Sequence, residues 1–357
     1  MGGRNNSNAR RRYRRARRLR GDRRAVVAVV GTLLALLVFF ALFGIFLTQY
    51  VPLWMTDNES QFTSQAATSF AEFKANVDNQ YSLNGPPTYG SSFTLSSQGV
   101  PLIAQPTEGT LLFLPTTCPQ GFVTVRSTGA VPGQPINPGF CAFQNITLSS
   151  GPGGSGLYSQ HIANGILEMV LPNRYYSAET FYFEDDAVVQ SQGGPQQIMA
   201  LPPPFTVSTV AGNTTVSSSF LQLVGNATTV IGQGSEQVYS HLRYSQKIAS
   251  NGTAIGTNPR LLNVTFEIGT QYPCAWATYL SSVMNASGVP VYQTGLKYPA
   301  SFYSWDSPIN GQPTVPVAHS ACISSRTTTV VALTITDVNY ATLFYAGAQV
   351  TVGIGGT

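Results

Sequence analysis

An uncharged run, Ala25–Thr48, limits what this chain can fold into more than any other feature of its sequence. The run reads AVVAVVGTLLALLVFFALFGIFLT and contains no proline. As an α-helix it would be roughly 36 Å long, enough to cross a hydrocarbon core of about 30 Å. Tyr50 and Trp54 follow it, and such amphipathic rings favour the membrane interface. The run predicts a transmembrane helix over residues 25–48.

The charges are distributed unevenly on the two sides of this run. Residues 1–24 contain 11 Arg and one Asp, a net charge of +10, whereas the rest of the chain holds the other 8 basic residues and 14 acidic residues, a net charge of −6. Positive residues flank the cytoplasmic end of a transmembrane helix. We therefore predict a cytoplasmic tail over residues 1–24, a single span in the cell membrane, and an extracellular main domain. The tail would attract nucleic acid too, but its placement beside the membrane accounts for the same arginines, so no nucleic-acid partner is predicted.

A helical period continues after the apolar run. Apolar residues recur at spacings of three and four, which is the pattern of one helix face, at Phe62, Ala66, Phe70, Phe73 and Val77. The polar residues Glu59, Ser60, Glu72, Lys74 and Asp78 occupy other positions. Pro52 lacks a backbone donor and predicts a bend. Residues 49–81 are therefore expected to form a kinked, amphipathic helical stalk.

Residues 82–357 have the pattern of a β-rich domain. Short apolar or alternating runs recur between Gly, Pro, Ser and Asn clusters, at Thr110–Leu114, Phe122–Arg126, Ile166–Leu171, Thr180–Val189, Phe205–Val210, Val216–Val224, Gln237–Ile248 and Leu261–Ile268. Thr327–Ile354 predicts two or three further strands, and one helix is expected from Pro273 to Gly288. The fold class is therefore mainly β, with an antiparallel β-sandwich-like domain that is either one elaborated unit or two abutting subdomains.

Four cysteines lie in this outer part: Cys118, Cys141, Cys274 and Cys322. An even number in an exported domain predicts two disulfides, and we prefer the pairs Cys118–Cys141 and Cys274–Cys322 because they close the shortest loops. A zinc site is disfavoured because the chain has no C-x-x-C pair and its three histidines are scattered. Candidate glycosylation sites with the Asn-x-Ser/Thr pattern are Asn58, Asn145, Asn213, Asn226, Asn251, Asn263 and Asn285.

The densest acidic cluster is Glu184, Asp185 and Asp186, between two strand-like halves. Three carboxylates offer the hard oxygen ligands that Ca²⁺ prefers, but no regular ligand spacing accompanies them. We therefore predict a solvated hairpin turn, and the three acids remain weak candidates for a metal site. The chain has no G-x-S-x-G elbow, and the glycine-rich Gly151–Gly156 lacks the Lys-Ser/Thr of a phosphate loop. Neither an enzyme nor a cofactor is predicted.

Arg24–Gly31, RAVVAVVG, and the apolar helix that follows resemble the amino-terminal segment of archaeal type IV pilins and pilin-like proteins. Those segments start with a basic residue, a small residue and a Val-Ser-Pro-Val-Ile-Gly-like run. Arg24 and Ala25 match the first two, whereas Val27 and Ala28 depart from the Ser-Pro pair. The resemblance implies cleavage between Ala25 and Val26 by a membrane peptidase, and close packing of neighbouring helices at Gly31.

NRYYSAETFYFEDDAVVQSQ and the stretch Pro202–Phe205 also resemble uncharacterised archaeal pilin-like surface proteins. The arginine-rich tail and the large outer domain differ from a major pilin. Two hypotheses follow. The first is a pilin-like structural or interaction protein of the cell surface, such as a minor pilin, with membrane lipid and other pilin-like subunits or surface proteins as partners. The second is a membrane-tethered binding module for a sugar, ion or peptide that does not polymerise.

Overall fold

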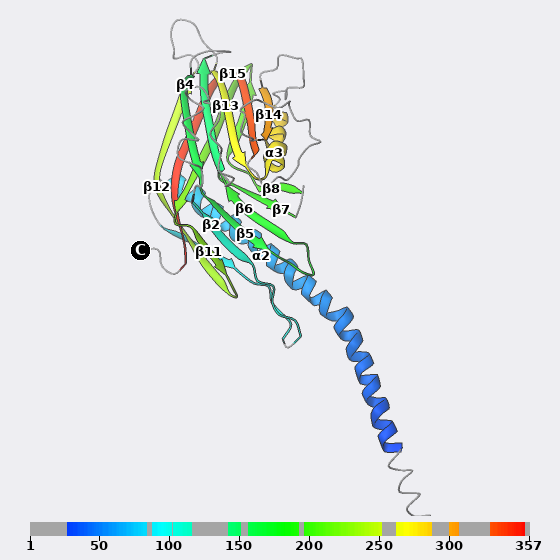
Figure 1. Cartoon of the computed structure of the whole chain (residues 1–357). Coiled ribbons are helices and arrows are strands. Elements are labelled where there is room, and N and C mark those ends of the chain that lie inside the picture. Colours follow the sequence, from blue (N-terminus) through cyan, green and yellow to red (C-terminus); the bar gives the residue numbers. More distant parts are fainter. Residues whose placement is uncertain are drawn as a thin grey trace, which may run out of the picture.

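The computed structural model describes residues 27–83, 88–101, 103–115, 142–150, 156–192, 196–251, 262–287, 300–306 and 329–353. One long helix leads into a body of two β-sheets (Figure 1). The predicted mainly-β, sandwich-like fold with an amino-terminal helix is confirmed. The predictions that fall outside the described residues are those for the tail 1–24, the Ala25–Val26 bond, Cys118, Cys141, Cys322 and the strand Phe122–Arg126.

The long helix is continuous through its proline. Residues 27–45 are α-helical, Phe46–Tyr50 form one π-helical turn (η1), and Val51–Leu83 continue as helix α2. In the π turn the N–H of Val51 donates to the carbonyl of Phe46, five residues earlier. Pro52 has no N–H to donate, and its ring would crowd the carbonyl one α-helical turn before it. The wider turn accommodates that ring, so the helix curves instead of breaking (Figure 1).

The larger sheet contains nine described strands in the order β1-β12-β15-β13-β3-β4, with β10 and β14 also paired to β15, and β9 paired to β10. Their bounds are β1 Tyr89–Thr94, β3 Ala142–Ser150, β4 Gly156–Asn164, β9 Phe205–Val210, β10 Asn213–Gly225, β12 Ser235–Asn251, β13 Leu262–Thr270, β14 Ala300–Asp306 and β15 Thr329–Val352. The smaller sheet has six described strands in the order β11-β2-β5-β6-β7-β8. These are β2 Thr110–Leu114, β5 Ile166–Leu171, β6 Glu179–Glu184, β7 Ala187–Ser191, β8 Gln197–Leu201 and β11 Thr228–Ile231.

The end of the chain differs from its prediction. Where two or three terminal strands were expected, β15 is a single strand of 24 residues. Its first half lies between β13 and β14, and its second half lies between β12 and β10, which runs parallel to it. At the change of partners, the side chain of Asn339 accepts a hydrogen bond from the Thr214 N–H at 2.8 Å. Polar residues that resemble a turn in the sequence therefore satisfy a neighbouring strand instead.

Two apolar clusters fill the body. The first lies on the part of the larger sheet that is covered by helix α3, Pro273–Ala286, whose Trp276, Leu280 and Met284 are buried in it. The second contains the predicted apolar face of helix α2, and all five of its residues, Phe62, Ala66, Phe70, Phe73 and Val77, are buried. That face was therefore predicted correctly.

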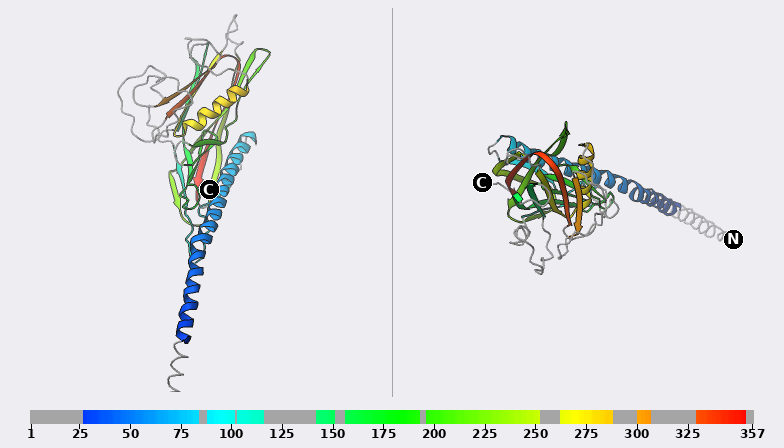
Figure 2. Two further views of the ribbon diagram at one scale, coloured as in Figure 1. Left: turned by 90° about the vertical axis from the view of Figure 1, so that its right-hand side faces the viewer. Right: turned by 90° about the horizontal axis from the view of Figure 1, so that it is seen from above.

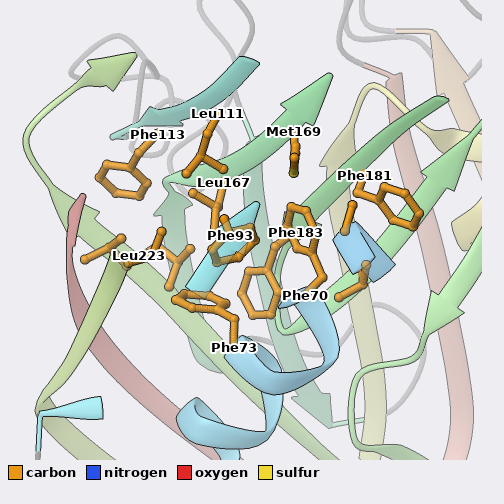
Figure 3. Packing of buried hydrophobic residues seen from close by; sticks show 14 of the residues in the cluster. Phe70, Phe73, Phe93, Leu111, Phe113, Leu167, Met169, Phe181, Phe183 and Leu223 are labelled. Carbon is orange, nitrogen blue, oxygen red and sulfur yellow. The ribbon is translucent and has the colours of Figure 1, made fainter. Parts of the chain in front are cut away.

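Helix α2 packs against β1 and β12 of the larger sheet and against β6 and β7 of the smaller one. It lies along one side of the body rather than below it (Figure 2). Its aromatic side chains meet those of both sheets (Figure 3). The ring centroids of Phe70 and Phe93 of β1 are 5.1 Å apart, and those of Phe73 and Phe183 of β6 are also 5.1 Å apart. Both pairs form edge-to-face contacts. The helix therefore joins the two sheets through one shared core.

The sheets also meet directly at Gly225, the last residue of β10. A Cβ placed there would lie 2.3 Å from the carbonyl oxygen of Val350 in β15 and 2.8 Å from the ring of Phe113 in β2. A real Cβ does not lie so close to atoms to which it is not bonded, so only glycine permits this approach of the smaller sheet to the larger one.

Candidate functional site

The first part of the long helix is exposed. Leu37 is 68% exposed and Phe39 is 61% exposed, and the other large apolar residues between Val27 and Tyr50 are similar. In the described part of the chain, one helix, Val27–Gln80, is long and apolar enough to span a membrane. Its most apolar stretch of 18 residues has a mean hydropathy of 2.7, and none of that stretch is buried. A core helix of similar composition would be covered by the rest of the protein, and this one is not.

The change from exposed to buried helix takes place within two turns. Val51 and Met55 are buried against the body, whereas Leu53 and Trp54, on the other side of the same turns, remain exposed. Contact with the body thus begins directly after the apolar run ends. The predicted stalk over residues 49–81 is helical, but it is part of the body's core and not a free spacer.

Glu59 forms a buried, charged contact between the helix and the body. Its carboxylate accepts hydrogen bonds from three consecutive backbone N–H groups, those of Arg174 (3.0 Å), Tyr175 (2.7 Å) and Tyr176 (2.7 Å), and from the hydroxyl of Thr107 (2.5 Å). The side chain is completely buried. Glu59 thus lies off the apolar face, as predicted, but it does not face solvent. Three converging N–H groups form a nest that favours an anion, and here a carboxylate of the protein itself fills it.

The ionisation of Glu59 follows from these contacts. Burial by itself raises the pKa of Glu59, but the hydrogen bonds from Thr107 and from the three N–H groups outweigh it and lower that pKa below its ordinary value. The carboxylate is therefore charged at neutral pH. No sequence signal connects Glu59 with this loop, because its partners lie about 115 positions later in the chain, as in its bond to Arg174.

Two loops are held against the helix at this level. The first is residues 97–101 and 103–107, between β1 and β2, and the side chain of Asn58 donates to the carbonyl of Gln98 in this loop at 2.8 Å. The second is residues 172–178, between β5 and β6, and the hydroxyl of Thr56 donates to the carbonyl of Tyr175 there at 3.3 Å. We call residues 97–101, 103–107 and 172–178 the junction loops. Together with Glu59, these bonds fix both loops relative to the helix.

A second buried charge contact lies about four helical turns further along. The Lys74 ammonium lies 3.0 Å from a carboxylate oxygen of Asp186 and 3.2 Å from Asp78, its neighbour one turn along the helix. Lys74 is 9% exposed and Asp186 is fully buried, so Lys74, although off the apolar face, also does not face solvent. Its stem runs along the helix into the body, and its charge reaches the turn of the β6–β7 hairpin.

The predicted hairpin at the acidic cluster is confirmed, but the turn is not solvated. Glu184 pairs with Ala187, and Asp185 and Asp186 form the two-residue loop with positive φ angles of 51° and 61°. A two-residue turn of this kind requires positive φ at both positions, where glycine and asparagine are usual. Side chains of Glu184, Asp185 and Asp186 are all fully buried, because the turn lies between Lys74 of α2 and Trp276 of α3.

Burial changes the ionisation of all three acids. It raises the pKa of Glu184 to about 7, although Thr270 and the indole N–H of Trp276 (2.7 Å) donate to its carboxylate. It likewise raises the pKa of Asp186 to about 7 against the opposing charge of Lys74. The pKa of Asp185 is well above its ordinary value because of burial and then because of its two acidic neighbours.

Asp185 has the fewest hydrogen-bond partners of the three acids. Neither of its carboxylate oxygens has a hydrogen-bond partner among the described residues, although the Gln144 amide is near enough to oppose the rise in its pKa. A cavity of about 20 Å³, lined in part by Gln144, Ser219 and Trp276, has room for one or two water molecules. Within the described ranges, no group of three or more His, Cys, Asp or Glu side chains is arranged to hold a metal ion. The contacts of this turn are those of a buried charge cluster that fastens α2 to the smaller sheet.

The remaining predicted sites are dispersed. Cys274, at the start of α3, is disulfide-bonded, and the preferred pairing stays a prediction because the other cysteines lie outside the described residues. Asn213, Asn226 and Asn285 are exposed. Among the other glycosylation candidates, Asn145 is on β3, Asn251 on β12 and Asn263 on β13, whereas the amide of Asn58 is already bonded to Gln98. Gly31 lies on the exposed apolar helix with open space around its Cα.

Comparison of the chain with protein-family models, with curated proteins and with solved structures finds no match. Function therefore has to be argued from the exposed apolar helix and from its connection to the body.

Proposed function

We propose that this chain is a single-pass, membrane-anchored structural or interaction protein of the cell surface, organised like an archaeal type IV pilin. Its amino-terminal tail would lie in the cytoplasm and its β-rich body outside the cell. One observation carries the proposal: the same continuous helix is exposed and apolar over residues 27–50 and supplies the core of the body from Val51 onward. An anchor built in this way cannot separate from the body unless the body's core is opened.

The charges on either side of the anchor support the orientation. The tail carries a net charge of +10 and the rest of the chain −6, which matches the excess of Arg and Lys on the cytoplasmic side of membrane proteins. The disulfide at Cys274 is also typical of an oxidising compartment outside the cytoplasm. The pilin-like part of the proposal depends on the resemblance of Arg24–Gly31 and on the shared plan of a long helix that carries a β domain.

The alternative of a tethered binding module finds less support among the residues that the structure describes. The cavity beside Phe205, Phe220, Phe266 and Trp276 has aromatic walls, but its volume of about 20 Å³ holds only one or two water molecules. Pockets for small molecules are usually about 300–1,000 Å³. The cavity is therefore far too small for a sugar or a peptide, and the anchor is the better guide to function.

The orientation is tested by adding protease to intact cells. We expect digestion of the body, beyond about residue 60, because it lies outside, and protection of the tail 1–24 by the membrane. The test uses the Ala25→Leu variant, which is expected to keep its tail, with a tag at each terminus. Antibodies against the two tags report both results on one blot, and permeabilised cells, in which both tags must be digested, are the control. Digestion of the tail in intact cells would reverse the proposed orientation.

The pilin-like part of the proposal is tested at Ala25. We expect the intact mass of the mature wild-type protein to correspond to a chain that begins at Val26, and the protein to be found in sheared surface filaments. Ala25→Leu should retain the tail and leave the filament fraction, whereas Ala28→Leu, an equal increase in size beyond the cleavage site, should still be cleaved. If the wild type retains residues 1–25 and Ala25→Leu changes neither measurement, the protein is an anchored surface domain without pilin-type processing.

A further inference from the structure

We infer that the junction loops, residues 97–101, 103–107 and 172–178, lie in the headgroup region of the outer leaflet, so that the body rests on the bilayer surface. This inference depends on the proposed function, because it requires the apolar helix to span the membrane. Its partner is lipid, and the loops would bind it as a fixed extension of the anchor.

The length of the apolar helix sets the level at which it leaves the membrane. From Val27 to Trp54 the helix is about 40 Å long at about 1.5 Å per residue, which equals the thickness of a bilayer with both headgroup layers. In the full-length chain, which the test below uses, Arg23 and Arg24 precede Val27 and limit how far the helix could move toward the outside. Trp54, an exposed indole, would therefore lie in the outer headgroup layer, where tryptophan is enriched.

The junction loops lie at the level of Trp54. The hydroxyl of Thr56, two residues beyond Trp54, bonds to the carbonyl of Tyr175, and Asn58 bonds to Gln98. Figure 1 shows the loop between β1 and β2 projecting at the end of the body from which the helix leaves. No helical spacer separates the end of the apolar run from the loops, so the loops lie beside the part of the helix that emerges from the lipid.

The junction loops expose side chains that suit a membrane interface. Tyr175 is 44% exposed, Tyr176 is 37% exposed, and Arg174 beside them is exposed too. Tyrosine rings and arginine stems are suited to the interface, because each combines an apolar part with a polar end. In the other loop, Ile103 is 40% exposed at the tip of a tight turn that is closed by hydrogen bonds between Val100 and Ala104.

An apolar tip of this kind is unusual for a loop in water, where Gly, Asn, Asp and Ser predominate. The exposed Leu53 and Trp54 lie on the helix at the same level and continue into the apolar run. Because these residues form an extension of the membrane-spanning surface, lipid is a better occupant than a separate protein. Glu59 holds the 172–178 loop through three backbone N–H groups, so that this loop is already ordered before it meets the bilayer.

The test uses the full-length, oxidised chain in phosphatidylcholine nanodiscs that contain lipids with a nitroxide either on the headgroup or deep in the acyl chain. Single cysteines at Ile103 and Tyr175 carry an environment-sensitive fluorophore, and the unsubstituted chain controls for labelling of other thiols. Leu37→Cys, in the middle of the apolar helix, reports the span. Val210→Cys, 70% exposed on the β9–β10 turn, is the matched apolar position at the other end of β10 from Gly225.

We expect headgroup nitroxides to quench the labels at Ile103 and Tyr175 strongly and the label at Val210 hardly at all, while deep nitroxides quench the label at Leu37. If the Ile103 and Tyr175 labels are quenched no more than the Val210 label while the Leu37 label is quenched, the inference fails and the membrane span stands. If the Leu37 label is not quenched, the proposed anchor itself is wrong. A blue shift at Ile103 without nitroxide quenching, together with two chains per nanodisc, would mean that a second copy covers the loops and would also overturn the inference.

Discussion

Replacing Lys74 by Met is expected to destabilise the body by up to about 1.4 kcal/mol more near pH 8 than near pH 5.5. Methionine keeps most of the apolar stem, so the change removes chiefly the positive charge that lies 3.0 Å from Asp186. Near pH 8 the wild type gains from ionising Asp186 beside Lys74, whereas the variant has to keep that buried acid protonated, because its pKa rises without the counter-charge. Near pH 5.5 that acid is protonated in the folded protein, because its pKa is about 7, and little charge remains to compensate.

The wild type should show part of the same pH dependence. The folded protein holds a proton on Asp186 and on Glu184 up to about pH 7, whereas the unfolded chain releases both near their ordinary pKa values of 3.8 and 4.5. Between these limits the folded state binds more protons, so the free energy of unfolding falls as pH rises toward 7. Without Lys74 the folded pKa of Asp186 rises further, and the fall continues to higher pH.

The measurement is denaturant unfolding of the wild type and Lys74→Met at both pH values. Asp78→Asn is the control, since it removes only the more exposed partner of Lys74, 3.2 Å away, and a pair of that kind contributes less than about 1 kcal/mol. An equal loss of stability at both pH values in Lys74→Met would mean that Lys74 acts through packing and not through its charge.

Replacing Glu59 by Gln is expected to lower the free energy of unfolding by about 2–4 kcal/mol at neutral pH. The carboxylate accepts four donors in a fully buried position, from Thr107 and from the backbone of Arg174, Tyr175 and Tyr176. An amide has one acceptor oxygen, and its NH₂ would face groups that also donate. With the amide oxygen in place of Oε2, the Arg174 N–H loses the second oxygen at 3.1 Å and faces a donor instead, and the bonds that remain lose the assistance of charge.

The contribution of Glu59 to the free energy of unfolding changes with pH in the opposite direction to those of Asp186 and Glu184. Because the folded pKa of Glu59 is lowered, its contribution is complete above its unfolded pKa of about 4.5 and is lost as pH falls through the folded value. The difference between wild type and Glu59→Gln should therefore shrink in acid. Hydrogen exchange at the amides of residues 174–176 should become faster in the variant.

Glu72→Gln provides the matched control for this change. Glu72 is exposed on the same helix, so the identical substitution there should alter stability by less than about 0.5 kcal/mol. If Glu59→Gln costs no more than Glu72→Gln, the hydrogen bonds of Glu59 do not hold the junction, and the fixed position of the 172–178 loop would need another explanation.

The sequence by itself determined those features whose cause is local. The apolar run and the face Phe62–Val77 were predictable because a helix repeats its environment every three or four residues. The strands Thr110–Leu114, Ile166–Leu171 and Phe205–Val210 were predicted with their observed bounds, since each is short, apolar or alternating, and flanked by turn residues. Pro273 marked the start of α3 for the same reason, because proline suits the first turn of a helix.

Only the tertiary structure decided where the buried charges lie. Glu59 and Lys74 occupy positions beside the apolar face, and nothing local distinguishes them from the exposed Glu72. They are buried because their partners, the 172–178 loop and Asp186, come from more than a hundred residues away. The acidic turn looked like a solvated hairpin because its sequence does not reveal that α2 and α3 enclose it. Local patterns specify how a segment folds, but which polar groups are buried depends on the distant segments that pack against them and satisfy their hydrogen bonds.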